Sequence, residues 1–170
     1  MLFRSSGSRP CADRLSNSSF RVHALPPDFL ARLRSTRLDA SGNHVESLSA
    51  QGREPLRCCL RYAEPGEPIL LFGYEPPIGK SPYREIGAVF AHAEACAGPA
   101  ADGYPEEWRG KPQVLRSYDA RGWIRDAVMH DGTDPEREIA RLLSDPEAVQ
   151  LHSRNVAYGC FMFVVTRKGA

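Results

Sequence analysis

Two adjacent cysteines, Cys58 and Cys59, are the side chains of this 170-residue chain best suited to nucleophilic chemistry. Alternation along a predicted strand over residues 56–63 turns Cys58 into an apolar row and Cys59 onto the face that carries Arg57 and Arg61. Nearby cations favour the thiolate, which is the nucleophilic form of cysteine. We therefore predict that Cys59 is a reactive nucleophile and that Cys58 is a small buried hydrophobe. The plainer alternative is that both arginines extend into water while Cys59 packs against their stems.

A general base for Cys59 is the role we assign to His152. It lies in the predicted strand 149–155, on the same face as Arg154, which would depress its proton affinity. A neutral imidazole can accept a proton or bind a metal. The alternative is a histidine that is hydrogen-bonded across a sheet. Glu85 is a further candidate catalytic carboxylate, with a salt bridge to a neighbouring arginine as its plainer interpretation.

Several arginines indicate an anionic ligand, because guanidinium groups match carboxylates and phosphates in charge and geometry. Arg116 and Tyr118 share one face of the predicted strand 113–118. A small anionic ligand is therefore predicted at a set of polar side chains made of Arg57, Arg61, Arg116, Tyr118 and Arg154. The residues decide neither the identity of the ligand nor whether the site catalyses a reaction.

Cysteine and histidine are also zinc ligands, which provides a second hypothesis. His92 shares its face with Ile86, Ala88 and Phe90, so a core histidine is its default interpretation, and Cys96 follows four residues later. No cofactor is predicted by the first hypothesis. The alternative is a zinc-stabilised structural or interaction module, although its ligand set lacks a Cys-x-x-Cys pair. That set consists of Cys59, His92, Cys96 and Cys160.

Composition excludes several classes of function. The 22 basic residues nearly balance the 21 acidic ones, which removes the electrostatic argument for binding nucleic acid or an anionic membrane. The longest apolar runs have about six residues, far fewer than the roughly 20 of a spanning helix. Five cysteines are an odd number and fit reduced thiols in the cytoplasm. Phosphate-binding loops, nucleophile elbows and His-Glu-x-x-His pairs do not occur. Oligomeric state does not follow from the sequence.

Short alternating segments separated by proline and glycine predict a strand-rich fold. Turn signals at residues 64–67 and 119–122 predict antiparallel hairpins. Strand periodicity is found in the following stretches: 56–63, 69–74, 85–92, 113–118, 123–129, 149–155 and 158–166.

Two helices complete the predicted fold. One begins at Pro26-Pro27 and stops before Asp39, and the other begins at the capping sequence Thr133-Asp134-Pro135-Glu136 and ends at Ser144. We expect a single α+β domain over residues 20–170, with a mainly antiparallel sheet and two helices, after a disordered tail over residues 1–19. The loop 97–110 is expected on the surface. If Tyr104 and Trp108 are exposed there, a third hypothesis is a protein-binding surface.

Several motifs in one order resemble the bacterial domain-of-unknown-function 1203 family, over roughly residues 20–168. The motifs are Pro55-Leu56-Arg57-Cys58-Cys59-Leu60, Ala63-Glu64-Pro65-Gly66-Glu67, Pro82-Tyr83-Arg84-Glu85, Phe90-Ala91-His92-Ala93-x-x-Cys96, Leu115-Arg116-Ser117-Tyr118-Asp119, His152-Ser153-Arg154-Asn155 and Gly159-Cys160-Phe161. The resemblance implies candidate positions and no mechanism. Those positions are Arg57, Cys59, Glu85, His92, Cys96, Arg116, Tyr118, His152, Arg154 and Cys160.

Two departures from the family pattern are visible. Leu56 stands where the family often has cysteine, which weakens any proposal that needs a thiol at that position and leaves Cys59 available. Gly87-Ala88-Val89-Phe90 replaces Gly-Pro-Ile-Phe, a change that affects strand stiffness or packing only.

Overall fold

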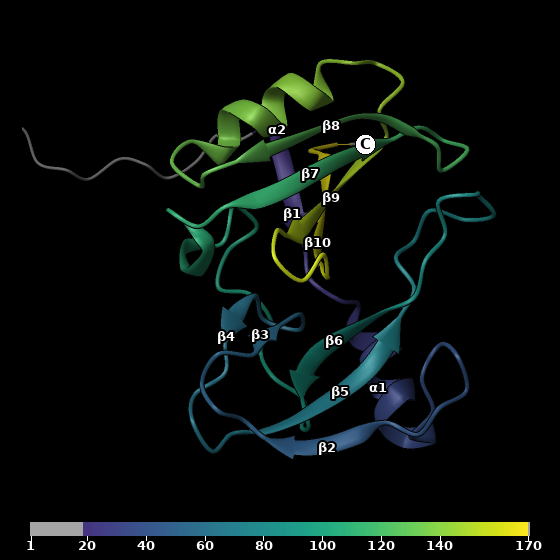
Figure 1. Ribbon diagram of the computed structural model, residues 1–170, viewed down its shortest axis with the longest axis vertical. Coiled ribbons are helices and arrows are strands. Elements are labelled where there is room, and N and C mark those ends of the chain that lie inside the picture. Colours follow the sequence, from purple (N-terminus) through teal and green to yellow (C-terminus); the bar gives the residue numbers. More distant parts are fainter. Residues whose placement is uncertain (1–18, 170) are drawn as a thin grey trace, which may run out of the picture.

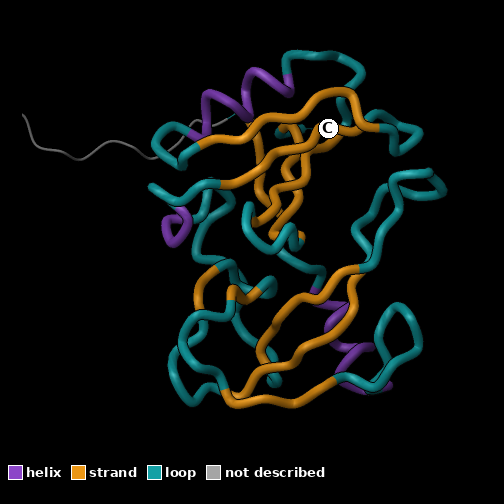
Figure 2. The backbone as a smooth tube through the Cα atoms, in the orientation of Figure 1, coloured by secondary structure: helices purple, strands orange, loops and turns teal. Residues whose placement is uncertain are grey.

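The computed structural model describes residues 19–169, which form two five-stranded sheets (Figures 1 and 2). The upper sheet in Figure 1 is antiparallel throughout. In spatial order its strands are β1 (Phe20–His23), β10 (Phe161–Arg167), β9 (Gln150–Asn155), β7 (Gln113–Tyr118) and β8 (Ile124–His130).

The lower sheet is mixed, because β3 pairs with β6 in parallel while its other pairs are antiparallel. In spatial order its strands are β2 (Glu46–Ser49), β5 (Pro68–Tyr74), β6 (Gly87–His92), β3 (Pro55–Leu56) and β4 (Arg61–Tyr62). The two-residue strands β3 and β4 are the shortest of the sheet, so most of its pairing lies in the β2–β5–β6 ribbon.

One helix packs on each sheet, and both begin where the sequence predicts. α1 (Pro27–Thr36) starts with proline in its first turn and ends at Arg37, which adopts a left-handed conformation with φ of 58°. α2 (Pro135–Leu143) is capped by Asp134, whose side chain accepts a hydrogen bond from the backbone N–H of Arg137 at 3.3 Å. A short 3-10 turn covers Glu106–Trp108. No helix within residues 19–169 is both long enough and apolar enough to span a bilayer.

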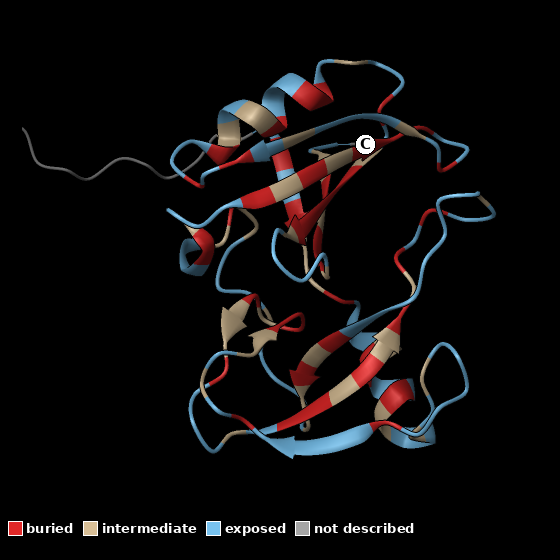
Figure 3. Ribbon diagram, viewed as in Figure 1, coloured by how far each residue is buried: buried red, intermediate tan, exposed pale blue. Residues whose placement is uncertain are grey.

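Two hydrophobic cores hold the sheets. In Figure 3 the buried residues are the red segments that recur along the strands and helices of both sheets. The first core lies between α1 and the β5–β6 ribbon and includes Leu30 and Phe72. The second lies between α2 and the upper sheet and includes Ile139 and Phe163. The turn after β3 joins them, since Cys58 belongs to the first core and Leu60 to the second. This turn therefore packs against both sheets through its own side chains.

The α+β class with two helices is confirmed, and most of the predicted strands lie where expected. Three details are wrong. The predicted strand 56–63 is two short strands, β3 and β4, on either side of a turn. The strands form two five-stranded sheets where one was predicted. The 64–67 turn joins β4 to β5 without pairing them, since β5 pairs with β2 and β6. The strands at 20–23 and 46–49 were not predicted: Phe20–His23 does alternate apolar and polar residues but is only four residues long, and Glu46–Ser49 has a single apolar residue.

The loop 97–110 does not expose its aromatic residues. Trp108 is 1% exposed and Tyr104 is 5% exposed, and both belong to the second core. The hypothesis of an exposed aromatic protein-binding loop is therefore wrong. The predicted disordered tail over residues 1–19 lies, except for Ser19, outside the described residues.

Candidate functional site

A tight turn over residues 57–60 brings the adjacent cysteines to the same side. Leu60 adopts a left-handed conformation with φ of 57°, and its N–H donates to the carbonyl of Leu56 at 2.9 Å. The chain reverses within four residues, so the alternation of a strand does not apply. The two sulfurs lie 3.9 Å apart, with the Cys58 thiol donating to Cys59. The prediction that Cys58 and Cys59 point to opposite faces is therefore wrong.

Both sulfurs face the ring of His92, at the end of β6. The Nδ1 atom of His92 lies 3.3 Å from the sulfur of Cys58 and 3.8 Å from that of Cys59. Cys96, in the loop that follows, completes a group whose four ligand atoms all lie within 4.8 Å of one another. We call Cys58, Cys59, His92 and Cys96 the thiol cluster.

These separations fit a tetrahedral metal ion. With Zn–S bonds of about 2.3 Å and Zn–N bonds of about 2.0–2.1 Å, a tetrahedron places two sulfurs about 3.8 Å apart and a sulfur about 3.5 Å from a nitrogen. The 3.9 Å between Cys58 and Cys59 and the 3.3 and 3.8 Å to His92 are close to those values. The backbone N–H of His92 also donates to the sulfur of Cys58 at 3.3 Å, which supports a thiolate there. Four protein ligands would leave no coordination position open.

The protonation of the thiols depends on their neighbours. The hydrogen bond to Cys59, and then burial, raise the pKa of Cys58, whereas the hydrogen bond from Cys58 lowers the pKa of Cys59. Burial raises the pKa of Cys96. Cys59 is thus the most acidic thiol, and the guanidinium of Arg61 also favours its thiolate. A coordinated metal would deprotonate all three.

The other ring nitrogen of His92, Nε2, lies beside the ion pair of Arg61 and Glu67. This nitrogen lies 3.0 Å from Nη2 of Arg61 and 3.5 Å from Oε1 of Glu67. Arg61 holds Glu67 through two contacts of 2.7 and 3.0 Å, and this hydrogen bonding lowers the pKa of Glu67 to about 2. A guanidinium can only donate, so Nε2 of His92 accepts from Arg61 in the described conformation. If Nδ1 bound a metal ion, Nε2 would carry the ring proton, and the carboxylate of Glu67, 3.5 Å away, could accept it as an outer partner of the ligand.

Two predicted site residues have other roles. Arg57 is 2% exposed, and it donates from Nε to the carbonyl of Phe161 at 2.8 Å and from Nη1 to the carbonyl of Pro55. Burial lowers its pKa to about 10. Arg57 therefore ties the turn to β10, and its buried guanidinium is directed to backbone carbonyls. Cys160 makes its contact with the carbonyl of Tyr158, so Cys58 takes the place that the zinc hypothesis gave to Cys160.

The remaining predicted residues gather at a second place, which we call the arginine cluster: Glu85, Arg116, Tyr118, His152 and Arg154. Arg116 of β7 stands opposite His152 of β9, and Tyr118 and Arg154 follow on the same face by alternation. This face is opposite to the one covered by α2, where Leu115 and Leu151 pack. Glu85, just before β6, contacts Arg116 at 3.2 Å and also pairs with Arg154. The predicted salt bridge of Glu85 to a neighbouring arginine is thus present.

His152 is fully buried in this cluster. Its ring centroid lies 4.5 Å from that of Tyr118 and 5.4 Å from that of Phe161. Burial, followed by the charges of Arg154 and Arg116, lowers the pKa of His152 to about 3. The imidazole is therefore neutral at pH 7, as predicted, and for the predicted reason together with desolvation.

Cys59 and His152 belong to different clusters, and no contact joins them among the described residues. The nucleophile and base predicted as a pair are thus not brought together. Arg61 belongs to the thiol cluster's surroundings, while Arg116 and Arg154 converge as predicted. Sequence reasoning missed Cys58 as a candidate ligand, since it assumed a strand, and missed Glu67 beside His92. The turn at residues 64–67 was predicted, and Gly66 has a φ of 87° there, but no sequence signal indicates that the turn brings Glu67 to His92.

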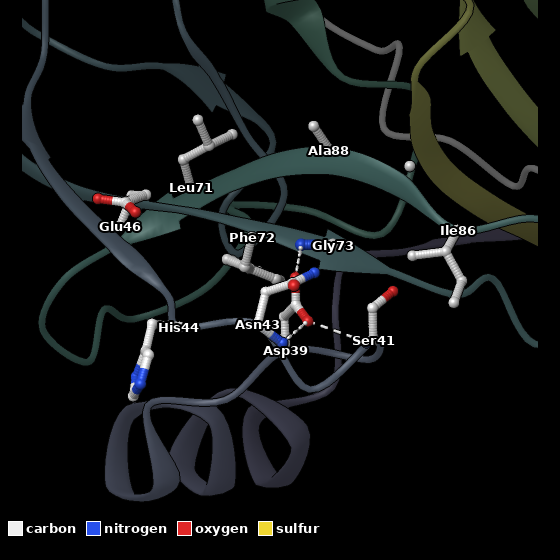
Figure 4. Close-up of a pocket in the computed structure, with 11 residues that line it drawn as sticks. Asp39, Ser41, Asn43, His44, Glu46, Leu71, Phe72, Gly73, Ile86 and Ala88 are labelled. Carbon is white, nitrogen blue, oxygen red and sulfur yellow. Dashed lines mark hydrogen bonds between the residues drawn. The ribbon is translucent and has the colours of Figure 1, made fainter.

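A shallow depression beside β2 and β5 carries no comparable chemistry (Figure 4). Its carboxylate, Asp39, accepts hydrogen bonds from the backbone N–H groups of Ser41, Asn43 and Gly73, each at 2.9 Å. These bonds close the loop after α1 and saturate the carboxylate. The depression is therefore accounted for by the local fold.

Fold and site together define an α+β protein with a thiol-rich candidate metal centre and a partly buried arginine cluster. Residues 53–167 match the model of a family of proteins of unknown function, DUF1203, and the chain belongs to that family. The matched region contains both clusters. Comparisons with curated proteins and with solved structures found no match.

Proposed function

We propose that this protein is a zinc-stabilised structural module whose metal is held by Cys58, Cys59, His92 and Cys96. The observation that carries the proposal is that four ligand atoms lie within 4.8 Å of one another, with the separations among Cys58, Cys59 and His92 close to those around tetrahedral zinc. Three thiolates and one imidazole are typical of structural zinc. Catalytic zinc sites keep one position for water or substrate, and this set supplies all four ligands from the chain.

The position of the cluster explains what the zinc would stabilise. Two ligands come from the turn that contributes to both cores, one from the end of β6, and one from the loop beyond it. A single ion would therefore fix the turn, with Leu60 in its left-handed conformation, against the β5–β6 ribbon. The guanidinium of Arg61 would offset the net negative charge of three thiolates around a divalent cation.

The energetic effect is large enough to measure. At a free zinc concentration a thousand times the dissociation constant, binding adds about 4 kcal/mol to the free energy of unfolding. For a domain of this size, 1 kcal/mol shifts the unfolding midpoint by roughly 2–4 °C. Removing the metal with a chelator should thus lower the midpoint by roughly 8–16 °C, and added zinc should restore it.

Elemental analysis of the purified protein tests the proposal. We expect one zinc per chain in the wild type and in Cys160→Ser, which is the matched control because Cys160 lies outside the cluster. Cys96→Ser removes the exposed ligand with the least disturbance of either core and should lose the zinc. A wild type purified without chelator that holds no zinc, or a Cys96→Ser protein that holds it as tightly as the wild type, would contradict the proposal.

A further inference from the structure

The arginine cluster combines a rigid buried cation with a partner that is easily displaced. The side chain of Arg154 is 6% exposed and belongs to the central strand β9, whereas the side chain of Glu85 is 44% exposed and belongs to the connection between β5 and β6. Arg116, at 34% exposure, lies between them in accessibility. The guanidinium groups are therefore held by the sheet, and the carboxylate reaches them from outside.

The charges of the cluster do not balance. Arg116 and Arg154 carry two positive charges, Glu85 carries one negative charge, and His152 is neutral, so one positive charge is left over. Taking an ion out of water costs several kcal/mol unless a partner compensates it. Burial lowers the pKa of Arg154, which is the direction expected for an incompletely compensated cation.

Buried polar atoms within the cluster also lack partners. Nε of Arg154 and Nδ1 of His152 are both buried without a hydrogen bond. Each belongs to a residue that is more than nine-tenths buried. Buried polar groups without partners are rare in folded proteins. These side chains have other contacts: Nη1 of Arg154 donates to the carbonyl of Gly159 at 3.0 Å, and Nε2 of His152 lies 3.3 Å from Oε1 of Gln150. The guanidinium of Arg154 also interacts with the hydroxyl of Tyr118.

We infer that the arginine cluster is a binding site for a small carboxylate ligand, and that the carboxylate of Glu85 occupies the place of the ligand's own carboxylate in the described conformation. A carboxylate is favoured over phosphate because the two guanidinium groups already hold one between them, each through one nitrogen to Oε1 of Glu85. A ligand with a second acceptor could also reach the unpartnered nitrogens of Arg154 and His152.

The connection that carries Glu85 is attached to the upper sheet at points other than Glu85. Ser81 donates to the carbonyl of Gly122 at 2.6 Å, and the side-chain amide of Gln150 donates to the carbonyl of Pro77 at 2.7 Å. Figure 1 shows this connection extending from the lower sheet towards the upper one. Glu85 can therefore turn out to solvent through its own side-chain torsions while the connection stays in place.

Isothermal titration of the zinc-loaded protein with succinate, at constant ionic strength, tests this inference. Glu85→Gln removes the competing charge and should bind succinate at least tenfold more tightly than the wild type. Glu75→Gln is the matched control, because Glu75 pairs with Arg84 on the same connection outside the cluster, and it should bind like the wild type. Adding Arg116→Gln to Glu85→Gln should weaken binding at least tenfold.

The outcomes separate this inference from the zinc proposal, since zinc content is measured on the same samples. Equal affinity of the wild type and Glu85→Gln for succinate, or no binding by either protein, would overturn the inference whatever the metal content. Inorganic phosphate binding Glu85→Gln more tightly than succinate would overturn the assignment to carboxylates. A shift of the His152 ring nitrogens in NMR spectra on addition of succinate, absent in the Arg116→Gln double variant, would support it.

Discussion

The buried imidazole of His152 makes stability depend on pH in a way that can be calculated. Its pKa falls from 6.5 to about 3 on folding, so the unfolded chain binds a proton at pH 5 that the folded protein does not accept. The contribution of His152 to the free energy of unfolding is therefore fully present above pH 6.5 and is lost as the pH falls towards 3. At about 1.4 kcal/mol for each pH unit, lowering the pH from 7 to 5 should cost about 2 kcal/mol through this residue alone.

Urea unfolding at pH 7 and pH 5 measures this contribution. His152→Phe keeps a ring between Tyr118 and Phe161 but cannot titrate. The free energy of unfolding that this variant loses between pH 7 and pH 5 should therefore be about 2 kcal/mol smaller than the wild type's loss. His23 and His130, whose pKa values are also lowered by burial, contribute equally to both proteins and cancel. The exposed His44 provides the control, since His44→Gln should keep the full loss. The reasoning is refuted if His152→Phe loses as much stability as the wild type.

Further predictions concern the metal centre and the second core. Glu67→Gln should weaken zinc binding roughly 10- to 100-fold in a competition assay, as expected for an outer partner of a ligand, while the exposed Glu64→Gln should not change it. Trp108→Ala should lower the free energy of unfolding by roughly 3–5 kcal/mol, and Trp123→Ala, 45% exposed, by far less; equal losses would contradict the assignment of the 97–110 loop to the core. Asp134→Ala should cost about 1 kcal/mol in urea unfolding, and no measurable loss would show that the cap of α2 is dispensable.

Much of the architecture follows from local pattern. The strand 113–118 and the start of α2 are predicted with their bounds because alternation and capping are properties of a few neighbouring residues. The strand 56–63 fails for a physical reason: Leu60 adopts a left-handed conformation that leucine rarely takes, and no local signal announces it. The short strand at 46–49 is fully exposed, so burial leaves no pattern in it.

The sequence predicted the residue types of the site and part of its grouping, since Cys59, His92 and Cys96 were placed in one set, but it missed the rest. His152, Arg116 and Arg154 meet because β7 and β9 pair in a register that alternation alone does not determine. Arg57 looked like a ligand-binding residue, yet its partner is a carbonyl 104 residues away, which only the folded chain reveals. The zinc hypothesis included Cys160, whereas the thiol cluster contains Cys58. Cys58 reaches the cluster because of the same turn that divides the predicted strand 56–63.

X-ray absorption at the zinc edge of the metal-loaded protein tests the central claim most directly. Coordination by Cys58, Cys59, Cys96 and His92 predicts three sulfur neighbours at about 2.3 Å and one nitrogen at about 2.0–2.1 Å. Cys96→Ser should lower the sulfur number by one in any zinc that it retains, and Cys160→Ser should leave it at three. A shell dominated by oxygen, or the same sulfur number in the wild type and Cys96→Ser, would contradict a zinc centre at the thiol cluster.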